Sequence, residues 1–136
     1  METLQKLSRA CYNPALGLLI IRVVAGAIFF LHGWMKFGNE AATLQFIQSI
    51  GLPGFMAYVV TWVEILGGAM LIFGILTRVA GVALAIVMVV AITKVTYPHG
   101  GLNGSQFEFM LLAVSLGLAL IGAGKYRAMN MFEQGN

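Results

Sequence analysis

The chain is poor in charge and has a single cysteine. Only 10% of its 136 residues are charged and 60% are hydrophobic, and the mean hydropathy is +0.89. A typical soluble domain has about 25% charged and about 45–50% apolar residues. A soluble fold of this size could not bury so much apolar surface in one core. The composition therefore indicates one integral membrane domain that spans residues 1–136.

These shortages exclude several kinds of chemistry. Cys11 is the only cysteine, so neither an intrachain disulfide nor a mechanism with two thiols in one chain is possible. The basic residues form no run that would follow a phosphate backbone, so nucleic acid is not an expected partner. The sequence contains no nucleotide-binding glycine motif and no Ser–His–acid arrangement. Its two histidines, His32 and His99, are too few for a metal site and a poor pair for a haem.

The apolar residues are concentrated in four segments, each close to the ~20 residues that cross a bilayer as a helix. The sequence predicts transmembrane helices at residues 15–35, 55–76, 79–94 and 107–123. Residues 40–50 mix apolar and polar side chains, which is typical of a helix lying along the membrane surface. The predicted fold class is therefore all-α: an antiparallel four-helix transmembrane bundle with a short interfacial helix after the first span.

The basic residues predict the orientation and the connections. Residues 97–104 are rich in turn formers and are predicted to be a loop. If both termini are cytoplasmic, the inner ends of the spans carry five basic residues and the outer ends two. The inner residues are Lys6, Arg9, Arg78, Lys125 and Arg127, and the outer ones are Lys36 and Lys94. This distribution follows the positive-inside rule, so the termini are predicted to be cytoplasmic.

Arg22 and Glu64 are the deepest ionisable residues of the predicted spans. Such side chains cost about 2.5–3.5 kcal/mol each to insert, so they normally face the bundle interior with partners. Counting from the predicted outer helix ends places Arg22 at a depth of about 20 Å and Glu64 at about 15 Å. We therefore predict a buried ion pair between them. The pair either locks two helices together or is functional, with Arg22 fixing a carbonyl and Glu64 exchanging a proton.

A second group of candidate residues lies near the predicted outer face: His32, Trp34, Lys36, Lys94 and Glu108. We expect His32 and Glu64 to line a funnel that opens outward. Each member also has a purely structural interpretation. The lysines can extend to lipid headgroups, and Trp34 can anchor its helix at the interface. Glu108 can complement its own helix dipole, and His32 can donate to a backbone carbonyl.

Two motifs resemble the DoxX family of membrane proteins. The stretch Leu18–Phe37 contains an arginine, a following glycine and a closing His-Gly-x-x-Lys-Phe, and the stretch Glu64–Arg78 reads EILGGAMLIFGILTR. A third likeness begins at Glu108, but Arg127 and Asn130 stand where the family has serine and aspartate. The resemblance covers about residues 15–130. It implies a four-helix bundle in the cytoplasmic membrane of a prokaryote.

The resemblance also implies a redox link. A related subunit belongs to a thiosulfate:quinone oxidoreductase, and other members associate with enzymes of thiol stress or superoxide detoxification. The expected function is thus a membrane component of a quinone-linked oxidoreductase or redox-stress system. The expected catalytic residues are Glu64, His32 and Arg22, and the expected quinone pocket comprises Arg22, Glu64, Trp34, Lys94 and Glu108. Electrons would come from a bound cofactor or a redox partner subunit, and whether the chain is itself an enzyme stays open.

The alternative is a protein without enzymatic activity, either a membrane scaffold or a small-solute transporter with a structural ion pair. Four short helices make a small transporter, so a homodimer would be expected. The pair Gly67-Gly68 and the spacing of Ala113 and Gly117 would allow close contacts between helices.

Overall fold

The computed structural model describes residues 1–128, so Asn130 of the third family likeness lies outside the described part. The described residues are helices and short connections. The helices are α1 (Glu2–Cys11), α2 (Pro14–Phe37), α3 (Glu40–Ser49), α4 (Met56–Phe73), α5 (Thr77–Ala91), the π-helical turn η1 (Ile92–Thr96), α6 (Tyr97–Gly104) and α7 (Gln106–Ile121). Three stretches, Pro14–Phe37, Met56–Phe73 and Thr77–Gly104, are long and apolar enough to cross a membrane, and α7 is a shorter apolar helix. The predicted all-α fold, with a short helix after the first span, is confirmed.

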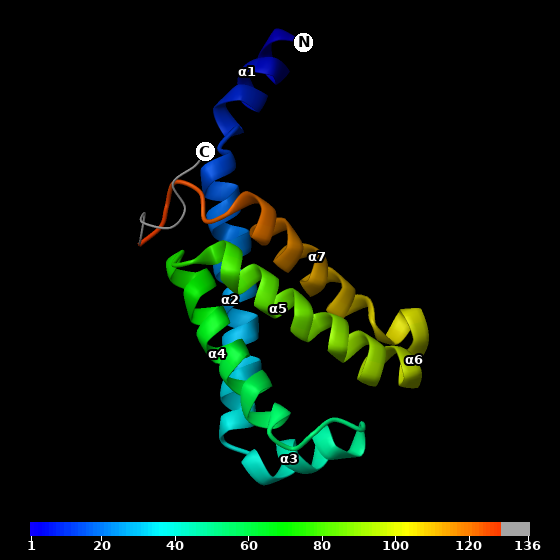
Figure 1. Ribbon diagram of the computed structural model, residues 1–136. Helices are drawn as coiled ribbons and strands as arrows, with labels where there is room; N and C mark the ends of the chain where they lie inside the picture. Colours follow the sequence, from blue (N-terminus) through cyan, green and yellow to red (C-terminus); the bar gives the residue numbers. More distant parts are fainter. Residues whose placement is uncertain (129–136) are drawn as a thin grey trace.

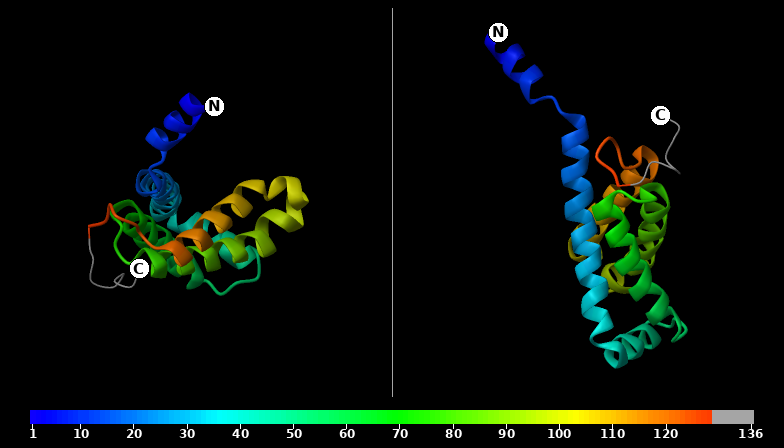
Figure 2. Two further views of the ribbon diagram at one scale, coloured as in Figure 1. Left: turned by 90° about the horizontal axis from the view of Figure 1, so that it is seen from above. Right: turned by 90° about the vertical axis from the view of Figure 1, so that its left-hand side faces the viewer.

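The long helices form two hairpins that pack on each other. Helix α2 packs against α4, α5 packs against α7, and α4 packs against α5. The two pairs cross, and they diverge toward the end of the molecule that carries α3 and α6 (Figure 1). We call this end the α3–α6 end and the opposite one the α1 end. Helix α1 projects away from the bundle (Figure 2), and none of its residues is buried.

Glycines bring the backbones of α2 and α4 into direct contact. A Cβ atom on Gly26 would lie 2.7 Å from the Gly68 carbonyl oxygen, and one on Gly33 would lie 2.9 Å from the Thr61 carbonyl oxygen. Any larger residue at these positions would push the helices apart, which explains the small residues at this membrane-helix interface. The contacts pair position 26 with 68 and position 33 with 61, and so they fix the register of the two helices.

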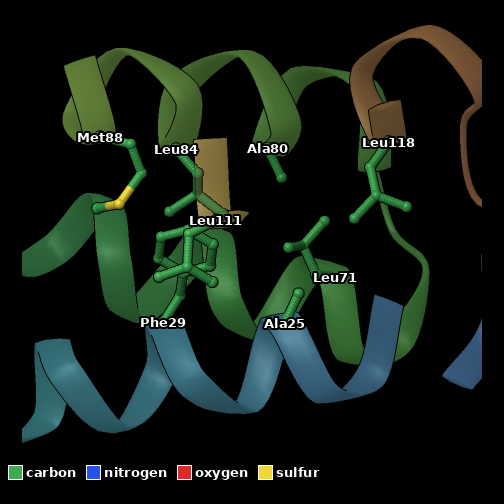
Figure 3. Close-up of a cluster of buried hydrophobic side chains, with 8 residues drawn as sticks. All are labelled: Ala25, Phe29, Leu71, Ala80, Leu84, Met88, Leu111 and Leu118. Atoms are coloured by element: carbon green, nitrogen blue, oxygen red, sulfur yellow. The ribbon is translucent and has the colours of Figure 1, made fainter. Parts of the chain in front are cut away.

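The core lies where the four long helices meet, and their outer faces are apolar as well. The buried cluster contains Ala25, Phe29, Leu71, Ala80, Leu84, Met88, Leu111 and Leu118 (Figure 3). On the outside, Val24, Leu66, Ile86 and Leu120 are 54%, 53%, 60% and 80% exposed. A helix that is apolar on every face suits a lipid environment, and helices leave no backbone group unpaired there. The protein is therefore a multi-pass membrane protein.

Two segments differ from the sequence-based expectations. Helix α1 was not predicted, because its polar residues carry no signal for a span. The predicted loop 97–104 is instead helix α6. Pro98 lies in its first turn, the part of a helix in which proline is most often found. Gly101 bends the helix with a φ of 59°, a value that glycine adopts without strain.

Candidate functional site

The predicted ion pair between Arg22 and Glu64 is wrong. Arg22 is 1% exposed, and its guanidinium donates from Nε to the Leu71 carbonyl at 2.7 Å and from Nη1 to the Ala123 carbonyl at 2.6 Å. Glu64 pairs instead with Lys36, whose Nζ lies 2.6 Å from Glu64 Oε2. Arg22 therefore ties α2 to α4 and to the segment after α7 at the α1 end. Glu64 belongs to the other half of the bundle.

The relative register of α2 and α4 explains why Arg22 and Glu64 do not meet. The contacts of Gly26 with Gly68 and of Gly33 with Thr61 place Glu64 level with residue 30 of α2. That level is eight residues from Arg22, about 12 Å along the helix. The depth estimate from the sequence failed because α2 continues two residues beyond its predicted end and α4 begins one residue later than predicted. Both shifts move Arg22 and Glu64 apart.

The Lys36–Glu64 ion pair has one buried and one partly exposed member. The Glu64 side chain is 4% exposed and the Lys36 side chain is 32% exposed. Lys36 lies in the last turn of α2, and its long side chain turns inward to the middle of α4. A charge-assisted bond of this kind is stronger than a neutral hydrogen bond. The pair thus holds an ionised carboxylate inside the membrane-spanning part of the protein.

The ion pair borders a cavity of about 180 Å³ between the two hairpins at the α3–α6 end, which we call the Glu64 cavity. Its walls come from α2, α3, α4, α5, η1 and α7, and they are mostly apolar or aromatic. The lining residues are Phe29, His32, Lys36, Phe46, Glu64, Met88, Ala91, Val95, Thr96, Phe107, Glu108 and Leu111. Three of them, Phe29, Met88 and Leu111, also belong to the core cluster, so the core forms one wall of the cavity (Figure 3).

Three residues of the cavity wall carry polar atoms that matter for a ligand. The Nδ1 atom of His32 lies 2.8 Å from the Ile28 carbonyl, which assigns the ring hydrogen to Nδ1 and leaves Nε2 as an acceptor. Glu108 Oε2 and Thr96 Oγ1 are buried and have no hydrogen-bond partner among residues 1–128. Buried polar atoms without a partner are uncommon in proteins. Two residues of the cavity wall, Thr96 and Glu108, therefore each carry a polar atom that no described residue satisfies.

The structure brings some of the predicted site residues together and separates others. His32, Glu64 and Glu108 line one cavity, as the expected funnel requires. Trp34 is 57% exposed and stacks between Phe30 and Phe37 on the outside of α2, with ring centroids 6.1 and 5.8 Å away.

Arg22 and Lys94, also predicted for the pocket, lie elsewhere as well. Arg22 is at the α1 end, and Lys94 is exposed on η1. None of the three separated residues lines the cavity.

Sequence reasoning missed Lys36 as a partner of Glu64 and missed Thr96 altogether. Lys36 belongs to the His-Gly-x-x-Lys-Phe motif, which was the available signal for its role. Thr96 was hidden by the π-helical turn η1, which carries one extra residue and shifts the following side chains by about 100° around the helix. Val95 and Thr96 consequently face the cavity while Lys94 does not. Turns of this kind are frequent at functional sites.

A family model named DoxX matches residues 17–97, from α2 to the first residue of α6. The protein belongs to the DoxX family. The matched region of this DoxX protein includes the Lys36–Glu64 pair and most of the cavity wall, and it ends before Glu108.

Two relatives have curated names. A Bacillus subtilis (strain 168) protein named "Putative oxidoreductase CatD" is 41% identical over 117 residues, which cover 86% of this chain and 87% of the relative. An Escherichia coli (strain K12) protein named "Inner membrane protein YqjF" is 39% identical over 62 residues, which cover 46% of this chain and 48% of the relative. No solved structure matches the chain.

Proposed function

We propose that this DoxX protein is a membrane component of a quinone-linked oxidoreductase system and that it binds a quinone headgroup in the Glu64 cavity. The observation that carries the proposal is the combination found there: apolar and aromatic walls around a Lys–Glu ion pair, with unsatisfied polar atoms beside it. Pockets for small molecules typically combine such walls with a few convergent polar groups. The name of the Bacillus subtilis relative supports an oxidoreductase system.

The size of the cavity fits a single ring. An apolar cavity of ~150 Å³ is known to accept benzene, and the Glu64 cavity measures about 180 Å³. A neighbouring cavity of about 80 Å³ shares Lys36, Phe46 and Glu64 with it, and it gives room for ring substituents. A longer apolar tail would leave between the diverging hairpins into lipid.

The polar groups suit the carbonyls and protons of a quinone. The Lys36 ammonium bonds to Glu64 with one N–H and has further N–H groups to offer a carbonyl oxygen. The Thr96 hydroxyl is a second donor. Quinone reduction consumes protons as well as electrons. Glu64 and His32 Nε2 are acceptors, so each would first take up a proton and then pass it to the quinone where water is scarce. Electrons would come from a redox partner subunit or a bound redox cofactor.

We place the protein in the cytoplasmic membrane as part of this proposal, with both termini in the cytoplasm. The α3–α6 end, and with it the Glu64 cavity, would then face outward. The distribution of basic residues supports this orientation. The name of the Escherichia coli relative supports the membrane.

Thermal unfolding of the purified protein with a short-tailed benzoquinone tests the proposal. At a ligand concentration of 100 times Kd, binding stabilises the folded state by about 2.7 kcal/mol, which raises the melting temperature. Lys36→Gln and His32→Ala should weaken the shift. Lys94→Gln is the matched control, because Lys94 is exposed and outside the cavity. It should leave the shift unchanged.

Two outcomes would contradict the proposal in different ways. If the wild-type melting temperature stays constant at saturating quinone, and no quinone is extracted with the protein from native membranes, the scaffold or transporter function is favoured. A shift that is equal in wild type, Lys36→Gln and His32→Ala would keep quinone binding but place it outside the Glu64 cavity, on the lipid-facing surface.

A further inference from the structure

We infer that the Glu64 cavity binds the reduced quinol in preference to the oxidised quinone. The inference rests on the proposed function and names the form of the ligand. Its basis is Glu108, a residue of the cavity wall whose buried Oε2 atom has no hydrogen-bond partner among residues 1–128. A quinol hydroxyl is a donor, whereas a quinone carbonyl can only accept.

Glu108 is not used by its own helix. It lies in the first turn of α7, where a glutamate commonly accepts a hydrogen bond from the N-cap backbone N–H. Here the N-cap is Ser105, and its N–H donates to the Leu102 carbonyl at 3.2 Å instead. The Ser105 hydroxyl donates to the Gly101 carbonyl at 2.8 Å. The N–H and the hydroxyl of the N-cap residue are therefore both bonded without the Glu108 carboxylate, which leaves that carboxylate to the cavity.

The charged side chains of the cavity also favour a ligand that donates a hydrogen bond. Its lining contains one cationic side chain, Lys36, and two carboxylates, Glu64 and Glu108. Lys36 is bonded to Glu64 at 2.6 Å, so no cation among the lining residues pairs with the Glu108 carboxyl group. A ligand carbonyl beside an ionised Glu108 would oppose one acceptor to another. A ligand hydroxyl would form a charge-assisted hydrogen bond with that carboxylate, the stronger class of such bonds.

The size of the expected preference for quinol follows from the free energy of one such hydrogen bond. Hydrogen bonds to charged groups contribute about 1.5–3 kcal/mol, which corresponds to a Kd ratio of roughly 10 to 150. We therefore expect quinol to bind at least about tenfold more tightly than the quinone with the same tail.

Three ligands with one alkyl tail separate hydrogen bonding from shape: the benzoquinone, its quinol and the dimethyl ether of the quinol. Affinities are measured without oxygen, by titration of the purified full-length protein. Wild type should bind the quinol best and the ether, which has no donor, poorly. In Glu108→Gln the preference should disappear, because the amide N–H can donate to the quinone carbonyl. Glu2→Gln makes the same change on the exposed helix α1 and should retain the wild-type preference.

The results distinguish failure of the inference from failure of the proposed function. Equal binding of quinone and quinol, or tighter binding of quinone, would overturn the inference and leave the quinone site standing. A preference that persists in Glu108→Gln would overturn the role of Glu108. If none of the three ligands binds wild type, the proposed function fails first. If Glu108→Gln does not fold, the comparison of the quinol with its ether on wild type still decides whether the cavity favours a ligand that donates a hydrogen bond.

Discussion

The Lys36–Glu64 ion pair predicts an asymmetric response to mutation. Lys36→Met would leave the Glu64 carboxylate, which is 4% exposed, buried without its cation. Glu64→Leu would leave Lys36, which is 32% exposed and can extend its ammonium toward water. The two single mutants should therefore differ in stability, although each removes one half of the same bond.

The burial of each partner sets the magnitudes. Removing one partner of a buried pair costs about 3–5 kcal/mol, so Lys36→Met should lower the free energy of unfolding by about 3 kcal/mol or more. Glu64→Leu should cost about 1 kcal/mol, as expected when the remaining charge reaches solvent. Replacing both partners by apolar residues is often close to neutral, so the double mutant should recover most of the loss. For a chain of this size, 3 kcal/mol corresponds to a melting shift on the order of 10 °C.

The measurement is thermal and denaturant unfolding of all three variants in one detergent. Lys94→Met is the control, because it makes the same change on an exposed lysine that has no place in the cavity. It should stay within about 0.5 kcal/mol of wild type. Equal losses in the two single mutants would refute the predicted asymmetry. A double mutant whose loss is the sum of theirs would show that Lys36 and Glu64 are not coupled.

Two further predictions concern Arg22 and the orientation of the chain. Arg22→Gln should destabilise the protein by about 2–4 kcal/mol, because each of two buried carbonyls loses its donor. Arg22→Lys should not restore stability in the same unfolding assay, since an ammonium lacks the planar fork, and full rescue by lysine would contradict the account. In intact cells, Asn103→Cys in α6 should react with a membrane-impermeant thiol reagent while the exposed Cys11 does not. The opposite labelling pattern would reverse the proposed orientation.

The spans were predictable because lipid surrounds them. Their lipid-facing and core-facing sides are both apolar, so hydropathy alone marks them. The first span was predicted at residues 15–35 and is Pro14–Phe37, and the interfacial helix was predicted at residues 40–50 and is Glu40–Ser49. Helix α6 was missed because its glycines and proline are usual turn formers. Here the proline is in the first helical turn and a glycine makes the bend.

The grouping of three site residues was predictable, and the ion pairs were not. His32, Glu64 and Glu108 were expected near one another because each was counted to lie toward the same ends of the predicted spans. Pairing depends on the relative register of two helices, and the Gly26–Gly68 contact that fixes it has no side chain to reveal it in the sequence. The same limit applies to Thr96, because a π turn changes the face of a helix without changing its composition.

The acceptors of Arg22 have a consequence for how the protein is made. The Leu71 carbonyl lies 49 residues further along the chain and the Ala123 carbonyl 101 residues further. Since ribosomes add about 5–20 residues per second, α2 exists for about 5–20 s before its arginine can meet the second acceptor. We infer that the membrane-insertion machinery receives the first helix with this charge unmatched by either carbonyl. The strongly apolar composition of α2 offsets that charge. Loss of apolar residues from α2 should thus impair insertion of the first helix, because fewer apolar side chains would then offset its arginine.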